Sequence, residues 1–334
     1  MTVFPCGIRG LGFYLPEAEL SVPALAQQAG LPDIVARFAG ARTVRQADPS
    51  DTPSSLAILA ARKALESAGV SARDIDAVIW CGAAVPDYLM PTSAGLIQHA
   101  LGIGHIQAFD VAQGCAAMLT ALQVAHGLMA LDSACRTVLV ASGDKWGAFT
   151  HHHNADSVFF GDAGGAFVLQ AHHQSLQPIA YHTLTRGEYQ PLWLLEAGGA
   201  RTPASALTVA QGRHIYKCHD PATAHGAFKE IYVPTLVDVA KTTLTKAGLG
   251  VSDIAFFSMV NANLRVLELT SAGLGIPIER TSASYLEEFG HLGAPDVFFN
   301  VQRAIEDDRL QPGDHVLLLT TGIGFFWVSA VIKC

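Results

Sequence analysis

Two residues far apart in the chain could act together as a nucleophile and its base, Cys115 and His291. Each follows a glycine directly and precedes a segment of helical pattern. A cysteine at a helix N-terminus is favoured as the thiolate, and an adjacent imidazole can take its proton. Because an isolated cysteine is more often an inert buried residue, the hypothesis depends on the fold bringing the two together.

A weak internal repeat predicts that Cys115 and His291 lie close together in the fold. Residues 57–78 align without a gap with residues 236–257. The matched residues are Leu65, Ala68, Gly69, Asp74 and Ile75 in the first copy, and Leu244, Ala247, Gly248, Asp253 and Ile254 in the second. Duplicated halves, here 1–175 with the cysteine and 176–334 with the histidine, would set the two residues at related points around a pseudo-two-fold axis.

The hydrophobic pattern predicts an α/β protein with buried sheets, because short apolar runs alternate with helix-like segments. The candidate strands are residues 77–81, 137–142, 166–170, 255–260, 315–320 and 328–333. Two helices of the repeat are expected at 54–68 and 235–247, each ending at a glycine suited to a C-cap.

Composition limits the function classes. With 334 residues, 50% of them hydrophobic and 15% charged, the chain can bury a large core. A net charge of −8 argues against nucleic acid as the main partner. We find no signal peptide and no run near the length of a membrane span, so we expect a cytoplasmic protein that does not bind membranes.

Neither a metal nor a cofactor is predicted. The six cysteines have no CxxC spacing, which argues against a zinc site. Adjacent histidines at 151–153 would point to opposite faces of an extended segment, which is unsuited to metal binding. His153 instead is considered as an alternative base or as part of an acceptor entrance.

Several co-linear motifs resemble the ketoacyl synthase III family of the thiolase superfamily. They lie at residues 7–17, 110–115, 160–166, 262–265 and 322–327. The resemblance implies a five-layered αβαβα fold, a homodimer, and acyl thioester donors carried on coenzyme A or acyl carrier protein. It also implies an acyl-enzyme on Cys115.

The chain departs from this family at the residues that promote condensation. Condensing members have His-Gln-Ala-Asn where this chain has Val260-Asn261-Ala262-Asn263, and an asparagine where it has His291. Valine cannot donate a hydrogen bond to the developing enolate, and loss of one such donor typically costs about 10²–10³ in rate. We therefore predict acyl transfer to a hydroxyl or amine, as in members of the family from polyketide and antibiotic biosynthesis.

In this hypothesis the backbone N–H groups of Cys115 and Ile323 hold the oxyanion and His291 is the base. Asn261, or alternatively Asn263, orients the imidazole. Arg265 and Arg42 are candidates for contact with the carrier.

Two other functions stay open at this point. One is a decarboxylating 3-oxoacyl synthase in which a histidine replaces the missing donor. The other is a non-catalytic partner subunit of a synthase complex, although the retained Cys115 weighs against it.

Overall fold

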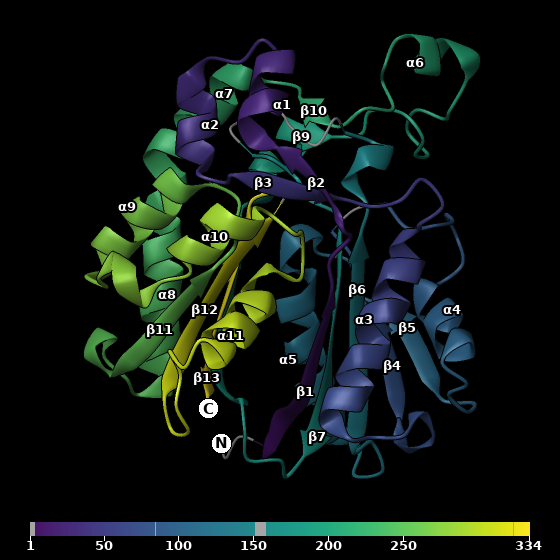
Figure 1. Cartoon of the computed structure of the whole chain (residues 1–334), viewed down its shortest axis with the longest axis vertical. Helices are drawn as coiled ribbons and strands as arrows, with labels where there is room; N and C mark the ends of the chain where they lie inside the picture. Colours follow the sequence, from purple (N-terminus) through teal and green to yellow (C-terminus); the bar gives the residue numbers. More distant parts are fainter. Residues whose placement is uncertain (1–3, 84, 151–157, 323) are drawn as a thin grey trace.

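Two central sheets lie side by side with helices between them and outside them, which gives five αβαβα layers (Figure 1). The structure is a computed structural model that describes residues 4–83, 85–150, 158–322 and 324–334. The first sheet has the strand order β1 (Cys6–Tyr14), β7 (Ala163–Ala171), β6 (Thr137–Asp144), β4 (Ala77–Trp80), β5 (Gln107–Asp110). The second has the order β11 (Ile254–Met259), β12 (His315–Gly322), β13 (Phe326–Lys333), β8 (Gln177–Thr185).

The middle layer consists of α5 (Ala117–Leu131) and α11 (Asp296–Glu306), whose apolar side chains share one core with strands of both sheets. The outer face of the first sheet is covered by α3 (Pro53–Ala68) and α4 (Ser93–Ala100). The outer face of the second is covered by α8 (Val233–Ala247) and α9 (Leu264–Leu274). The active-site candidates therefore lie where the two halves meet.

The predicted repeat is present in the fold. The α3 helix begins at a capping box of Thr52 and Ser55 and ends at Gly69, while α8 ends at Gly248, and both glycines are left-handed. Each helix leads through a 3₁₀ turn, Ala72–Asp74 or Val251–Asp253, into a strand, β4 or β11.

Strand pairing extends the repeat. The β4 strand runs parallel to β6 as β11 does to β12, and β6 and β12 each pair antiparallel with the next strand, β7 and β13. All six candidate strands are confirmed as β4, β6, β7, β11, β12 and β13. Strands β1 and β8 were not predicted.

An excursion from the first half consists of the antiparallel pair β2 (Ala18–Ser21) and β3 (Thr43–Gln46), with α1 (Val22–Gln28) and α2 (Asp33–Ala39) between the two strands. A second excursion contains a 3₁₀ segment (Gly187–Leu192), β9 (Trp193–Leu194), α6 (Ala206–Ala210), β10 (Lys217–Cys218) and α7 (Pro221–Ala227). Figure 1 shows α6 on a lobe that projects from the body. Two more helices complete the second half, a 3₁₀ turn (Ile278–Arg280) and α10 (Ala283–Phe289).

One segment, Gly114–Leu131, is long and apolar enough to cross a membrane by length and composition. This corrects the expectation that no run approaches that length. The segment contains α5 and lies in the core between the two sheets, where contacts with both halves account for its apolar sequence.

Candidate active site

Cys115 lies where the first half turns toward the second. It follows Gly114, which has a φ of 51°, in a 3₁₀ turn (Gly114–Ala116) that leads directly into α5. Its side chain is only 7% exposed. The hydroxyl of Thr320, at the end of β12 in the other half, donates to the Cys115 carbonyl at 3.2 Å. The cysteine is thus held by both halves at the N-terminal end of a buried helix.

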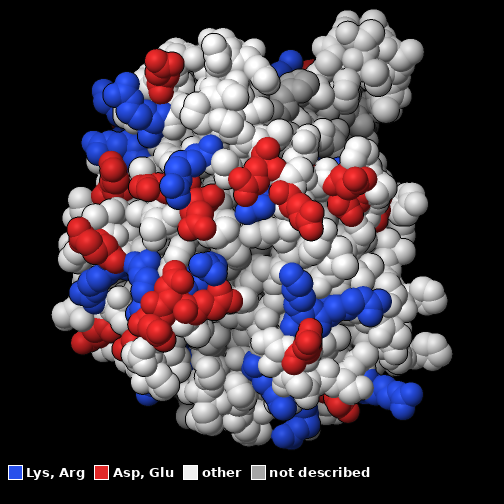
Figure 2. All heavy atoms as spheres, in the orientation of Figure 1, with Lys and Arg blue, Asp and Glu red and all other residues white. Residues whose placement is uncertain are grey.

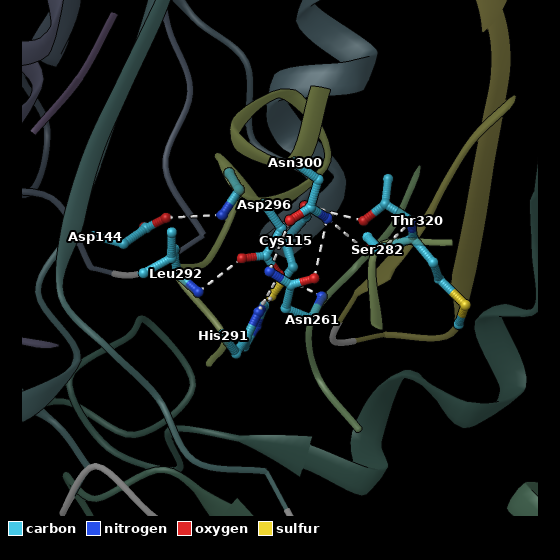
Figure 3. Close-up of polar contacts among 11 residues, drawn as sticks. Cys115, Asp144, Asn261, Ser282, His291, Leu292, Asp296, Asn300 and Thr320 are labelled. Atoms are coloured by element: carbon cyan, nitrogen blue, oxygen red, sulfur yellow. Dashed lines mark hydrogen bonds and ion pairs between the residues drawn. The ribbon is translucent and has the colours of Figure 1, made fainter. Parts of the chain in front are cut away.

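His291 reaches the same point from the second half. It follows α10 and Gly290, and its Nε2 atom lies 3.2 Å from Sγ of Cys115 (Figure 3). The imidazole is 2% exposed and lies near the rings of Trp146 and Phe160. The fold therefore brings together the two residues that the repeat set opposite each other.

Asp296 completes the arrangement and was not predicted. Its Oδ2 atom lies 2.5 Å from Nδ1 of His291. The same carboxylate accepts the backbone N–H of Asn261 at 2.7 Å and that of Leu292 at 2.7 Å. Asp296 is 1% exposed and is the first residue of α11, where the helix dipole favours a negative charge. Nδ1 of the imidazole is held as the donor, which leaves Nε2 to exchange a proton with Cys115.

The expectation that Asn261 orients the imidazole is wrong in this structure, because Asp296 occupies that position. The Asn261 amide forms a reciprocal pair with Asn300, with N–O distances of 3.1 and 3.0 Å. Asn300 also donates to the carbonyl of Met259 at 3.1 Å. Asn261 acts on the site through its backbone N–H, which helps hold the Asp296 carboxylate.

Opposing effects set the pKa of His291. Burial lowers it, but the charges of Asp296 and Cys115 and the hydrogen bonds to both raise it, and together they leave the pKa well above its usual range. The geometry therefore favours an imidazolium next to the sulfur of Cys115 in the resting enzyme. The imidazolium is thus placed to stabilise negative charge that develops on the sulfur in a site largely shielded from water.

A tight turn positions the histidine and the aspartate. Gly293 has a φ of 87°, and a Cβ there would lie 2.2 Å from a carboxylate oxygen of Asp144. That carboxylate, at the end of β6, accepts the backbone N–H groups of Ala294 at 2.9 Å and Ala83 at 2.6 Å. The turn between His291 and Asp296 is therefore fastened to the first half and requires glycine at 293.

An apolar cavity of about 420 Å³ opens onto Cys115 and His291. Aromatic side chains form part of its wall. The aromatic lining residues are Phe160, Trp193, Tyr216, Phe228, Tyr232 and Phe325. Val260 also lines it, so an aliphatic side chain occupies the position where the condensing members have histidine. A cavity of this size and lining suits an acyl group bound beside the sulfur.

Comparison with known proteins places the chain in a family. The models of 3-oxoacyl-[acyl-carrier-protein] synthase III and of its C-terminal part match residues 109–187 and 244–334. The β-ketoacyl-[acyl-carrier-protein] synthase III of Roseiflexus sp. (strain RS-1) is 33% identical over 328 residues, which cover 98% of this chain and 97% of that protein. The chain belongs to the 3-oxoacyl-[acyl-carrier-protein] synthase III family.

Solved structures agree with this assignment. A crystal structure of 3-oxoacyl-(acyl-carrier-protein) synthase III matches with a TM-score of 0.86 and 27% identity, over 99% of this chain and 100% of the other. ChlB3, named an acyltransferase, matches with a TM-score of 0.81 over 98% of this chain and 97% of its own, but its 23% identity shows the fold alone. As a synthase III family member, the protein is an acyl-transferring enzyme of the ketoacyl synthase type.

The remaining predicted residues fall in different places. Asn263 caps α9, accepting the N–H of Val266 at 3.1 Å, and also lines the cavity. Ile323, expected to supply an oxyanion donor, and His153, the alternative base, lie outside the described residues. Gly322 lies against the backbone N–H of Cys115, since a Cβ at 322 would be 3.1 Å from that nitrogen.

The two arginines proposed for carrier contact are exposed. Arg265 pairs with Glu268 on α9 at 2.9 Å, and Arg42 lies just before β3. On the face in Figure 2, basic and acidic side chains are interspersed over this part of the molecule. No group of three or more metal-ligating side chains occurs among residues 4–83, 85–150, 158–322 and 324–334.

Asp296 could have been found from the sequence. It follows Pro295 at the start of a helical pattern, five residues after His291, and an acidic residue in the first turn of a helix is a common signal. What the sequence did not reveal is that the turn from 291 to 296 folds back so that Asp296 meets the imidazole.

Proposed function

We propose that the protein is an acyltransferase that moves an acyl group from a carrier thioester, through an acyl-enzyme on Cys115, to a hydroxyl or amine. One observation carries this proposal. His291, with Asp296 behind it, is built as a general base that faces the sulfur of Cys115. Nucleophile, base and orienting carboxylate in this order are the arrangement of acyl-transfer triads.

The first half-reaction loads the enzyme. The sulfur of Cys115, with its proton already on Nε2 of His291, attacks the carbonyl carbon of the donor thioester as a thiolate. The bond from that carbon to the donor sulfur breaks as the bond to Sγ forms, and the donor leaves as a thiol with the proton from His291. The backbone N–H groups of Cys115 and Ile323 are proposed to stabilise the oxyanion.

The second half-reaction delivers the acyl group. The acceptor attacks the acyl carbon while Nε2 of His291 removes its proton. The bond to Sγ then breaks, and the products are an ester or amide and the Cys115 thiolate beside the His291 imidazolium. The Asp296 carboxylate stabilises the imidazolium and keeps the ring in place throughout.

The residues that line the cavity support decarboxylative condensation less well than they support acyl transfer. That reaction needs donors on the thioester oxygen of the second substrate while an enolate forms, and Val260 cannot provide one. The second candidate function is nevertheless decarboxylative condensation, because the relatives are named β-ketoacyl-[acyl-carrier-protein] synthase III.

We further infer that the donor is carried on acyl carrier protein or coenzyme A, as the family name implies, and that the enzyme is a cytoplasmic homodimer. Polyketide or antibiotic biosynthesis is the proposed setting. Exposed Arg265 and Arg42 are the proposed contacts for the acidic carrier, and each would act only as a surface charge.

A product analysis tests the proposal. The enzyme is first loaded with an acyl group from a panel of acyl-coenzyme A and acyl-carrier thioesters, and then offered alcohols and amines or ¹³C-carboxyl malonyl thioester. Formation of an ester or amide without release of ¹³CO₂ supports acyl transfer. Release of ¹³CO₂ together with a 3-oxoacyl product supports condensation instead.

A further inference from the structure

A π-helical turn shapes one wall of the acyl cavity. Phe228–Tyr232 form this turn between α7 and α8, and both end residues line the cavity. Their rings lie 4.5 Å apart, and the ring of Tyr232 also contacts Phe325 at 5.8 Å. Single π turns within helices are rare and occur often at functional sites. This one places the phenol of Tyr232 among otherwise apolar side chains.

A second hydroxyl lies beside that phenol. Thr321, on β12, lines the same cavity, and its hydroxyl oxygen is buried without a hydrogen-bond partner among the described residues. Its neighbour Thr320 uses its own hydroxyl on the carbonyl of Cys115. A buried hydroxyl without a hydrogen-bond partner is unfavourable. A ligand or a small rearrangement would therefore be expected to supply a hydrogen bond to the Thr321 hydroxyl.

The two hydroxyls influence each other. Burial raises the pKa of Tyr232, Thr321 opposes this shift, and the charge of Cys115 adds to it. Tyr232 is therefore a neutral phenol that interacts with Thr321, and both residues line the cavity together with Cys115. The two are close enough to interact, yet they form no hydrogen bond of normal geometry.

The rest of the cavity limits what this phenol can recognise. Among the described lining residues there is no Lys, Arg, Asp or Glu. A carboxylate on the acyl group would lose its water, and the His291 imidazolium, which acyl transfer itself uses, is the cation it would meet beside the sulfur. A neutral oxygen would instead gain a hydrogen bond from Tyr232 while the remaining carbon atoms pack against Trp193, Phe228 and Phe325.

We propose that Tyr232 is a specificity-determining residue that selects an acyl group with an apolar body and one neutral oxygen substituent, a hydroxyl or carbonyl, close to the thioester. Thr321, the neighbouring hydroxyl on the cavity wall, is the candidate positioning residue for the phenol. The inference rests on the proposed function, because it describes the acyl group that Cys115 accepts. It concerns loading alone and is independent of the acceptor.

The test compares matched donors that differ by one oxygen. The rate of Cys115 acylation is measured by intact-protein mass spectrometry with butanoyl, 2-hydroxybutanoyl and 3-hydroxybutanoyl groups on coenzyme A and on acyl carrier protein. For the wild type we expect at least one hydroxybutanoyl donor to react about tenfold faster than butanoyl, the value of one neutral hydrogen bond. Tyr232→Phe should abolish that preference, so that the hydroxybutanoyl donors react no faster than butanoyl in the variant.

Three further variants separate recognition from packing. Tyr189→Phe is the matched control, because Tyr189 also packs on Phe325, at 4.9 Å, but does not line the cavity, and it should keep the preference. Thr321→Val should reduce the preference and Thr321→Ser should restore it. Equal rates for all donors in the wild type, or an unchanged preference in Tyr232→Phe, would overturn the inference while leaving acyl transfer intact. Absence of loading by every donor would instead contradict the proposed function and the inference with it.

Discussion

The Asp296 carboxylate lies 2.5 Å from Nδ1 of His291. It also accepts hydrogen bonds from the backbone N–H groups of Asn261 and Leu292. The contact with Nδ1 fixes which imidazole nitrogen faces Cys115. It also distinguishes this site from that of a condensing member of the family, in which a histidine and an asparagine are expected.

Asp296→Asn should slow acyl delivery by about 10²- to 10⁴-fold, because an amide can hold the imidazole in the wrong tautomer. Single-turnover transfer from a preloaded enzyme measures this step. Asp238→Asn, which removes an exposed carboxylate on α8, is the matched control and should react like the wild type. If the two variants react equally fast, Asp296 does not orient the base.

The rate of delivery should rise with pH as the His291 imidazole of the acyl-enzyme loses its proton. The base must be neutral to accept a proton, and the pKa of His291 is raised despite burial, which lowers it. Asp296→Asn removes a leading cause of the increase and should move the midpoint to lower pH. A pH profile of single-turnover delivery checks both statements, and an unchanged midpoint in the variant would contradict them.

The pair of Asn261 and Asn300 should affect stability more than chemistry. Asn300→Leu leaves the buried amide of Asn261 with an unpaired group, so we expect a loss of about 1–3 kcal/mol in the free energy of unfolding. The double variant Asn261→Leu with Asn300→Leu should lose less than the sum of the single variants. Denaturant unfolding measures these free energies. At temperatures where the Asn261→Leu variant is folded, Cys115 should still be acylated.

Gly293→Ala should destabilise the turn that carries the histidine. The left-handed backbone and the contact with Asp144 both oppose a side chain there, and we expect a loss of about 2 kcal/mol or more. Gly104→Ala is the control, because no heavy atom lies within 4 Å of a Cβ at that position. Equal stability of the two variants would show that the turn tolerates a side chain.

The apolar runs predicted an α/β fold and the repeat predicted its duplication, whereas the five layers were expected from the resemblance to the family. Helix ends at Gly69 and Gly248 and the six central strands follow from local patterns, which depend on neighbouring residues only. Strands β1 and β8 were missed. The β1 strand contains several glycines, which weaken its apolar alternation.

The site was only partly predictable, for a physical reason. The meeting of Cys115 and His291 follows from symmetry between the halves. The choice between Asn261 and Asp296 as the partner of the imidazole depends on the path of the turn at Gly293, which is set by a tertiary contact with Asp144. The asparagine was favoured because it lies in a motif, whereas its amide is used by Asn300.

The most direct test of the central claim is the fate of a preformed acyl group on Cys115, followed by intact-protein mass spectrometry together with ¹³CO₂ detection. The wild type should load, then discharge to an alcohol or amine without consuming ¹³C-carboxyl malonyl thioester. Cys115→Ala should not load, while His291→Ala should still load to some extent and fail to discharge. Discharge of the wild type only with malonyl thioester, with one ¹³CO₂ released per acyl group, would contradict the account.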